Sequence, residues 1–342
     1  MAEILPPKST ASRLLAEAMR HEMERDASIL ILGEDVGKLG GVFNATRGLQ
    51  ETFGEWRVRD TPISEMGFTG MAVGLAMAGY RPIVEIMFAD FVGVCLEQIV
   101  NAMAKIPYMS GGRVKMPVVV RMAGGSIGSA AQHSQCLWGA FGHWPGLKVI
   151  APSCPADYHG LLTAAIRSDD PVIFIEHKSH LNRRADTFRR PEIGAIGEAA
   201  AIGKAAVARP GRDLTLVSIS AAVEWALEAA DDLAAEGIEV EVIDLRSLVP
   251  LDIETVLASF AKTGRLLVVD EDFLSYGMSG EILARVAETG ATGQMRRLCM
   301  PDIPLPAALS LETAVMPGRD AIAARVREMI ADRPPSSQTA SR

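Results

Sequence analysis

The stretch that decides the fold is Gly67-Phe-Thr-Gly-Met-Ala-Val-Gly-Leu-Ala-Met-Ala78, together with the Pro82-Ile-Val-Glu-Ile-Met87 segment that follows it. Small residues crowd the first part and predict a closely packed helix, whereas the apolar second part predicts a buried strand. The alternation continues on both sides, with strands predicted at 28–32, 116–121, 147–151 and 171–176 and helices at 91–105 and 156–167. Because strands separated by helices need crossover connections, this order predicts a parallel sheet.

A second α/β unit follows the first. Strands are predicted at 214–219, 238–244 and 265–270, and helices at 222–236, 252–261, 279–288 and 319–330. Between the units, basic residues, prolines and glycines indicate a linker with only a weak strand near 199–206. We therefore predict two domains with parallel or mostly parallel sheets, at 1–180 and 212–332, a linker at 181–211 and a disordered tail at 333–342.

Composition excludes several classes of function. The formal charge of −8 leaves no surplus of positive charge for binding nucleic acid. The four cysteines form no CxxC pair, so neither a zinc cage nor a disulfide framework is indicated. No apolar run approaches the roughly 20 residues of a membrane helix, and no signal peptide is visible. We expect a soluble, cytoplasmic protein without a membrane partner.

Two side chains stand out as candidates for chemistry. Glu65 lies directly before the run of small residues, where a helix dipole would favour its charged form and an apolar pocket would disfavour it. A capping glutamate is the alternative. His133 lies in a loop of glycine, serine and alanine after a predicted strand, and ligands of open α/β sheets bind at the carboxyl ends of strands. A structural or surface histidine is the alternative there.

Five motifs, in this order and at this spacing, resemble the beta subunit of the E1 component of 2-oxo acid dehydrogenase complexes. They are Asp60-Thr-Pro-Ile-Ser-Glu-Met-Gly-Phe68, Glu85-Ile-Met-Phe-Ala-Asp-Phe91, Tyr108-Met-Ser-Gly-Gly112, Ala131-Gln-His-Ser-Gln135 and Pro145-Gly-Leu-Lys-Val149. The family contains pyruvate, branched-chain 2-oxo acid and acetoin dehydrogenases. The resemblance implies a thiamine diphosphate pyrimidine-binding domain followed by a transketolase C-terminal-like domain.

The resemblance also implies roles for individual residues. Glu65 takes the place of the glutamate that hydrogen-bonds N1' of the aminopyrimidine and so favours the imino form that activates the thiazolium ring. Ile63, Met87 and Phe91 take the places of apolar contacts to the pyrimidine, with plain core packing as the alternative. His133 takes the place of a histidine in the substrate channel and is expected to assist catalysis. His143 and His159 carry only a structural interpretation.

A monovalent-cation site, usually for potassium, belongs to the same family. By resemblance its ligands are mainly main-chain oxygens at the turn between the helix that ends in Ala165-Ile166-Arg167 and the following strand, at Ala165, Ile166 and Asp170. Here the turn reads Ser168-Asp169-Asp170-Pro171, which departs from the usual family sequence. A structural turn closed by Asp170 is the alternative, although a hard cation accepts carbonyl and carboxylate oxygens alike.

The chain lacks the Gly-Asp-Gly motif that holds magnesium and the cofactor's pyrophosphate in thiamine enzymes. The nearest fragment, Gly33-Glu-Asp35, has no third glycine, and Asp35 is interpreted as a solvated loop acid. The resemblance therefore implies an alpha subunit that holds Mg²⁺ and completes an α2β2 heterotetramer, and an E2 lipoyl acyltransferase as a further partner. No residue of the second domain is predicted to be catalytic, and Asp270-Glu-Asp272 is interpreted as a solvated strand end.

The expected function is the beta half of a thiamine diphosphate-dependent E1. With an alpha subunit it would decarboxylate a 2-oxo acid, pyruvate first, and reductively acylate lipoyl-E2. Acetoin cleavage and branched-chain 2-oxo acids are alternatives. Two more distant alternatives are a transketolase-like half enzyme that does not use lipoamide and a non-catalytic scaffold that binds E2.

Overall fold

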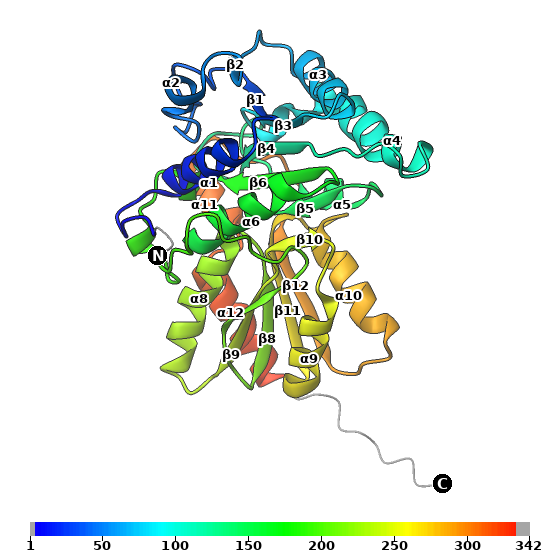
Figure 1. Ribbon diagram of the computed structural model, residues 1–342. Coiled ribbons are helices and arrows are strands. Elements are labelled where there is room, and N and C mark those ends of the chain that lie inside the picture. Colours follow the sequence, from blue (N-terminus) through cyan, green and yellow to red (C-terminus); the bar gives the residue numbers. More distant parts are fainter. Residues whose placement is uncertain (1–3, 333–342) are drawn as a thin grey trace.

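Two sheets organise the chain, and the computed structural model describes residues 4–332 of it (Figure 1). The first sheet has seven strands in the order β10-β5-β6-β4-β3-β1-β2. Its strands are β1 (Ile29–Gly33), β2 (Val58–Asp60), β3 (Arg81–Ile86), β4 (Val119–Gly124), β5 (Lys148–Ile150), β6 (Val172–His177) and β10 (Ser247–Val249). All of its pairs are parallel except that of β10 with β5. The predicted mostly parallel sheet is confirmed.

The second sheet has five strands in the order β12-β11-β8-β9-β7. They are β7 (Ala206–Arg209), β8 (Leu214–Ser218), β9 (Val240–Asp244), β11 (Arg265–Phe273) and β12 (Gln294–Met300). Only β7 runs antiparallel to its neighbour, β9. The weak strand expected near 199–206 therefore lies later in the chain, and β10 and β12 have no counterpart in the sequence-based prediction.

Helices cover both faces of each sheet. In the second domain α8 and α12 share one buried cluster and α9 and α10 share another, on opposite faces (Figure 1). In the first domain α1 and α6 pack on one face, whereas α3 and the segments after it pack on the other. The helices with regular geometry are α1 (Ala11–Arg25), α2 (Leu49–Phe53), α3 (Glu65–Met77), α4 (Ala104–Met109), α5 (Trp138–Gly142), α6 (Pro155–Arg167), α7 (Lys178–Leu181), α8 (Ala221–Ala234), α9 (Ile253–Thr263), α10 (Met278–Glu288), α11 (Leu309–Val315) and α12 (Arg319–Ala331).

The single helix predicted at 91–105 is wrong. The segment instead consists of a 3₁₀ helix η1 (Ala89–Cys95), a π-helix η2 (Gln98–Met103) and then α4. A second 3₁₀ helix, η3 (Ala185–Thr187), lies in the linker. Pro107 lies inside α4 and has no N–H to donate to the preceding turn, so a regular hydrogen-bond ladder cannot pass through it. Such irregular turns often occur at functional sites.

One hydrophobic core spans both domains. Trp138 and Phe141 of the first domain belong to the same buried cluster as Val217, Phe260 and Met278 of the second. The domains are therefore joined by apolar packing as well as by the chain that links them. Within residues 4–332 no helix has both the length and the apolar character that crossing a membrane would require. The tail predicted at 333–342 lies outside the described residues.

Candidate active site

Glu65 is the first residue of α3, and the surface around it is open. Its side chain is half-buried, whereas Ile63 is 85% exposed and Met66 is 57% exposed. The segment leading to it follows β2, and Thr61 N donates to Gly33 O at the end of β1 (2.9 Å). Glu65 therefore lies at the carboxyl edge of the first sheet. Core packing, the alternative interpretation of Ile63, is wrong because this side chain is exposed.

Glu34 is a second carboxylate at the same edge, and the sequence analysis missed its importance. It directly follows β1, and its Oε1 is buried without a hydrogen-bond partner among residues 4–332. Burial, and then the carboxylates of Glu65 and Asp35, raise the pKa of Glu34. Two carboxylates that disfavour each other's charge can share one proton. The signal in the sequence was an acidic residue directly after a buried strand.

Three rings form an aromatic cluster beyond the end of β3. The Phe88 and Phe91 centroids are 5.4 Å apart, and His133 lies 5.3 Å from Phe88 and 5.4 Å from Phe91, with all three pairs edge-to-face. The structure thus brings Phe91 and His133 together, as a shared site requires. Met87 is half-buried beside them in sequence. Phe88, the ring that contacts both neighbours, was not singled out from the sequence.

Glu65 is linked to this cluster through η1. Cys95, at the end of η1, is fully buried, and this burial raises its pKa to about 11; the hydrogen bond with Thr69 opposes the rise, and the nearby Glu65 carboxylate adds a smaller rise. Phe91 belongs to the same 3₁₀ helix, which packs against α3. The carboxylate and the aromatic wall therefore lie on elements in direct contact.

The acidic strand end of the second domain is buried, so its interpretation as solvated was wrong. Asp270, Glu271 and Asp272 are 0%, 5% and 7% exposed. They complete β11 where it meets the first domain, and Trp138 Nε1 donates to Asp270 Oδ1 (3.0 Å). Burial and the Asp272 carboxylate raise the pKa of Asp270 to about 8. Contact between a strand end and another domain has no local sequence signature. The run of three acidic residues was therefore interpreted as exposed to solvent.

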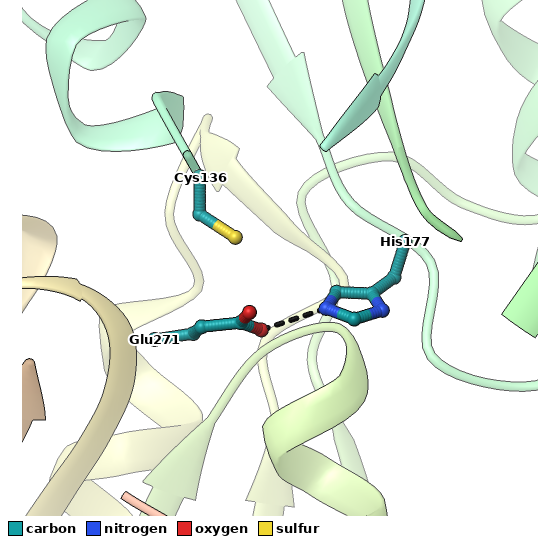
Figure 2. Close-up of side chains that lie close together, drawn as sticks. All are labelled: Cys136, His177 and Glu271. Atoms are coloured by element: carbon teal, nitrogen blue, oxygen red, sulfur yellow. Dashed lines mark hydrogen bonds and ion pairs between the residues drawn. The ribbon is translucent and has the colours of Figure 1, made fainter. Parts of the chain in front are cut away.

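Cys136, His177 and Glu271 converge behind the His133 loop (Figure 2). All three are buried, and their ligand-type atoms lie within 4.8 Å of one another. His177 Nε2 and Glu271 Oε2 are 2.8 Å apart, and His177 Nδ1 lies 2.7 Å from Ser179 Oγ. Both ring nitrogens therefore have partners, and the pair joins the end of β6 to β11 across the two domains. Burial raises the pKa of the Cys136 thiol well above its usual range.

Lys178 is the next residue after this histidine and is also buried. Its Nζ has no hydrogen-bond partner in the described part of the chain and lies 5.4 Å from the Phe88 ring centroid. Burial lowers its pKa, against the opposing charge of Asp90. A buried ammonium beside the aromatic cluster was not anticipated from the sequence.

Basic side chains surround the predicted cation turn. Arg81 donates from Nε to Ile166 O (3.1 Å) and from Nη2 to Ser168 O (2.6 Å). Ala165 O accepts Ser168 N (3.1 Å), and the Asp170 carboxylate lies 3.0 Å from Lys148 Nζ. The turn is therefore closed by hydrogen bonds and ion pairs of this chain. A carbonyl oxygen has two lone pairs, so a potassium ion would have to share Ile166 O with Arg81. Potassium binding here stays a prediction.

Comparisons with known proteins agree on the family. The model of the transketolase pyrimidine-binding domain matches residues 8–184, and that of the transketolase C-terminal domain matches residues 203–322. The 2-oxoisovalerate dehydrogenase subunit beta of Bacillus subtilis is 43% identical over 91% of this chain and 95% of its own length. The acetoin:2,6-dichlorophenolindophenol oxidoreductase subunit beta of Cupriavidus necator is 45% identical, over 91% and 94% respectively.

Two further similarities extend this result. The mitochondrial pyruvate dehydrogenase E1 component subunit beta of Drosophila melanogaster is 43% identical over 90% of this chain and 85% of its own. Among solved structures, a split-gene transketolase described as an inactive beta4 tetramer superposes with a TM-score of 0.77, at 22% identity, over 94% of this chain and 98% of that one. At that identity the superposition supports the two-domain fold alone.

Proposed function

Because this chain belongs to the family of E1 beta subunits of pyruvate, branched-chain 2-oxo acid and acetoin dehydrogenases, we propose that it supplies the cofactor-activating half of a thiamine diphosphate site. The observation that carries this proposal is the position of Glu65. It begins α3 at the carboxyl edge of the sheet, half-buried in its own chain and bordered by exposed apolar residues. Such a carboxylate would become buried if another protein surface bound to this edge of the sheet.

Glu65 would hold a proton at N1' of the cofactor's aminopyrimidine. The residues present fit such a group, because Glu34 Oε1 is buried and unpaired within residues 4–332 and the same neighbourhood disfavours a second negative charge. A proton held between Glu65 and that ring nitrogen would relieve the repulsion felt by Glu34. When bound, thiamine diphosphate supplies a thiazolium that stabilises negative charge at the reacting carbon.

Apolar side chains would orient the pyrimidine beside this glutamate. Phe91 is held by Phe88 and His133, and Met87 is half-buried at the end of β3. Ile63 offers an exposed apolar surface next to Glu65. We assign the pyrimidine contacts to Ile63, Met87 and Phe91, and Phe88 packs edge-to-face against Phe91. An apolar wall also excludes water, which strengthens each hydrogen bond made inside the site.

An alpha subunit would hold the remaining half of the cofactor. The sequence contains no Gly-Asp-Gly motif for Mg²⁺ and pyrophosphate. We therefore propose an α2β2 assembly in which Mg²⁺ is bound by the alpha chain, an E2 lipoyl acyltransferase as the acceptor, and a cytoplasmic location. The four cysteines, all free, are consistent with a reducing compartment.

His133 would act on the substrate side of the site. Its ring is half-buried and held between two aromatic edges, so its orientation is restricted while one side stays accessible. An imidazole in this position can steady a substrate oxygen or pass a proton during acyl transfer. We assign it as the accessory group for reductive acylation of the lipoyl arm.

The reaction class is better supported than the substrate. Relatives named for 2-oxoisovalerate, acetoin and pyruvate are 43%, 45% and 43% identical, so identity does not separate them. We propose pyruvate as the first substrate to assay, with acetoin and branched-chain 2-oxo acids as alternatives. A transketolase-like half enzyme and a scaffold without activity are the rival functions.

The test is reconstitution with the alpha subunit. The co-purified pair should consume one of the three substrates with thiamine diphosphate and Mg²⁺, and it should acylate a lipoyl domain. Dye reduction without lipoyl acylation would favour the transketolase-like alternative. Stable assembly with E2 but no thiamine-dependent turnover on any of the substrates would favour the scaffold.

A further inference from the structure

The loop that carries His133 is held in an unusual backbone conformation. Between β4 and α5, three residues have left-handed φ angles: Gly125 (86°), Gly128 (79°) and Ala130 (63°). For alanine this region is sterically unfavourable, and such residues persist only where surrounding contacts fix them. Contacts outside the loop must therefore determine where His133 points.

Those contacts are carboxylates at three points along the loop. Near its start, Glu271 Oε1 accepts Ser126 N (2.8 Å) and Ser126 Oγ (3.0 Å). Two residues later, Gly128 N donates to both oxygens of Glu312 (2.9 and 3.1 Å). Beyond His133, Gln135 N and Nε2 donate to Asp90 Oδ1 (3.2 and 2.8 Å).

Two of these three anchors come from the other domain. Glu271 lies on β11 and Glu312 on α11, and their side chains are buried. Hydrogen bonds from backbone N–H groups to charged, buried acceptors are stronger than those to neutral acceptors. Together they oppose the strain of one left-handed alanine. The C-terminal domain therefore sets the geometry of the part of the loop that precedes His133.

His177 locks the first anchor in place (Figure 2). It bonds the second oxygen of Glu271, so both carboxylate oxygens are used. A Cβ added to Gly125 would lie 2.0 Å from His177 Nε2, which shows how closely the loop backbone packs on this ring. Burial would raise the pKa of Glu271, but His177 and the bonds from Ser126 lower it below its ordinary value. The carboxylate is held in its charged, accepting form.

We infer that Glu271 and Glu312 of the C-terminal domain are positioning residues that hold the 125–135 loop so that His133 faces the reaction site. This inference rests on the proposed role of His133. It gives the second domain, in which no residue was predicted to be catalytic, an influence on acyl transfer. Neither glutamate needs to touch substrate or cofactor.

The test uses Glu271→Gln and Glu312→Gln in the full chain, co-purified with the alpha subunit. Glu236→Gln is the matched control, because it removes a carboxylate of the same domain that pairs with Arg327 at the surface. Hydrogen exchange at the Ser126 and Gly128 amides should rise about tenfold or more in the respective variant, since a charge-assisted bond is lost. Lipoyl acylation should fall about 10- to 100-fold, as expected for a misplaced catalytic group. The control should change neither readout.

A double-mutant comparison separates positioning from general destabilisation. In a His133→Ala background, Glu312→Gln should cause little further loss of acylation, because the group that it positions is gone. Equal losses in both backgrounds would overturn the inference, and so would unchanged loop exchange in both glutamine variants. Faster exchange with normal acylation would also overturn it. Normal acylation by His133→Ala alone would instead contradict the proposed function.

Discussion

The two sides of the candidate site differ in how completely this chain builds them. On the Glu65 side, apolar residues such as Ile63 and Met66 are exposed, and the carboxylate itself is only half-buried. On the His133 side, the loop is held by carboxylates from two domains, and its neighbour Ser134 is 1% exposed. The His133 side is held by contacts within the chain. The Glu65 side leaves apolar side chains exposed that another protein surface could cover.

The exposed side extends well beyond Glu65. Large apolar side chains are exposed along α3 and the segments packed against it, namely Ile63, Met66, Met71, Met77, Val94, Tyr108 and Met109. Soluble monomers rarely display so many on adjoining elements, and such surfaces mark interfaces. The contrast shows that the chain fixes the His133 loop by its own contacts and leaves an apolar surface exposed around Glu65.

The largest expected effect is on catalytic turnover and comes from the Glu65 side. Glu65→Gln should leave assembly with the alpha subunit intact while lowering kcat by about 10²- to 10⁴-fold, because an amide cannot exchange a proton with N1'. Steady-state turnover of the reconstituted pair measures this. Glu55→Gln, an exposed acid of the same domain, is the control. Turnover within a few-fold of the parent would remove Glu65 from its role.

The next largest effect is on lipoyl acylation and comes from the His133 side. His133→Ala should lower lipoyl acylation by about 100-fold and affect cofactor affinity less, if the ring serves the substrate side as proposed. Separate assays of dye reduction and lipoyl acylation resolve the two half-reactions. His143→Ala changes an exposed histidine nearby and should be neutral. A change confined to thiamine diphosphate affinity would argue against this assignment.

A smaller effect concerns the stability of the folded chain when the loop on the His133 side is changed. Gly125→Ala should lower the free energy of unfolding by about 2–4 kcal/mol, since it combines a left-handed alanine with a collision against His177. Gly79→Ala is the matched control: its φ is +95°, but an added Cβ would meet no heavy atom within 4 Å. Chemical denaturation of both variants isolates the collision. Equal losses of unfolding free energy in the two variants would mean that the His177 side chain moves aside at no cost.

The smallest expected effect is a pH dependence at the domain junction. The pKa of Asp270 is raised in the folded protein to about 8, so its contribution to stability is full below the unfolded pKa and is lost as pH rises through about 8. Asp270→Asn keeps an oxygen for Trp138 Nε1 and carries no proton to lose. Relative to the parent, its free energy of unfolding should rise steadily between about pH 5 and about pH 8. A constant difference across that range would contradict the shift.

The sequence predicted what is local and missed what depends on tertiary contacts. Periodicity located α3, β3 and β6, because their apolar residues are buried within one domain. It missed β10, which pairs with β5 of the other domain, and it misread the acids at 270–272, which are buried by Trp138 and its neighbours. It also replaced η1 and η2 by one helix, because composition does not reveal a change of helical pitch.

The same distinction between local features and tertiary contacts applies to the candidate site. The motif residues Glu65, Phe91 and His133 carried recognisable sequence context, and the structure places Phe91 against His133. Glu34, Phe88 and Lys178 became visible only once strand ends and rings were arranged in space. The anchors of the His133 loop lie about 145 and 184 residues away along the chain from the groups that they bind. No local pattern links residues at such separations.

We propose that this chain provides the Glu65 part of a shared site, which an alpha subunit completes. The most direct measurement is thiamine diphosphate-dependent turnover of the purified chain, with and without the alpha subunit, at saturating cofactor, Mg²⁺ and substrate. The account predicts no turnover from the isolated chain and activity upon addition of the partner, abolished by Glu65→Gln. Cofactor-dependent turnover by the isolated chain would contradict it.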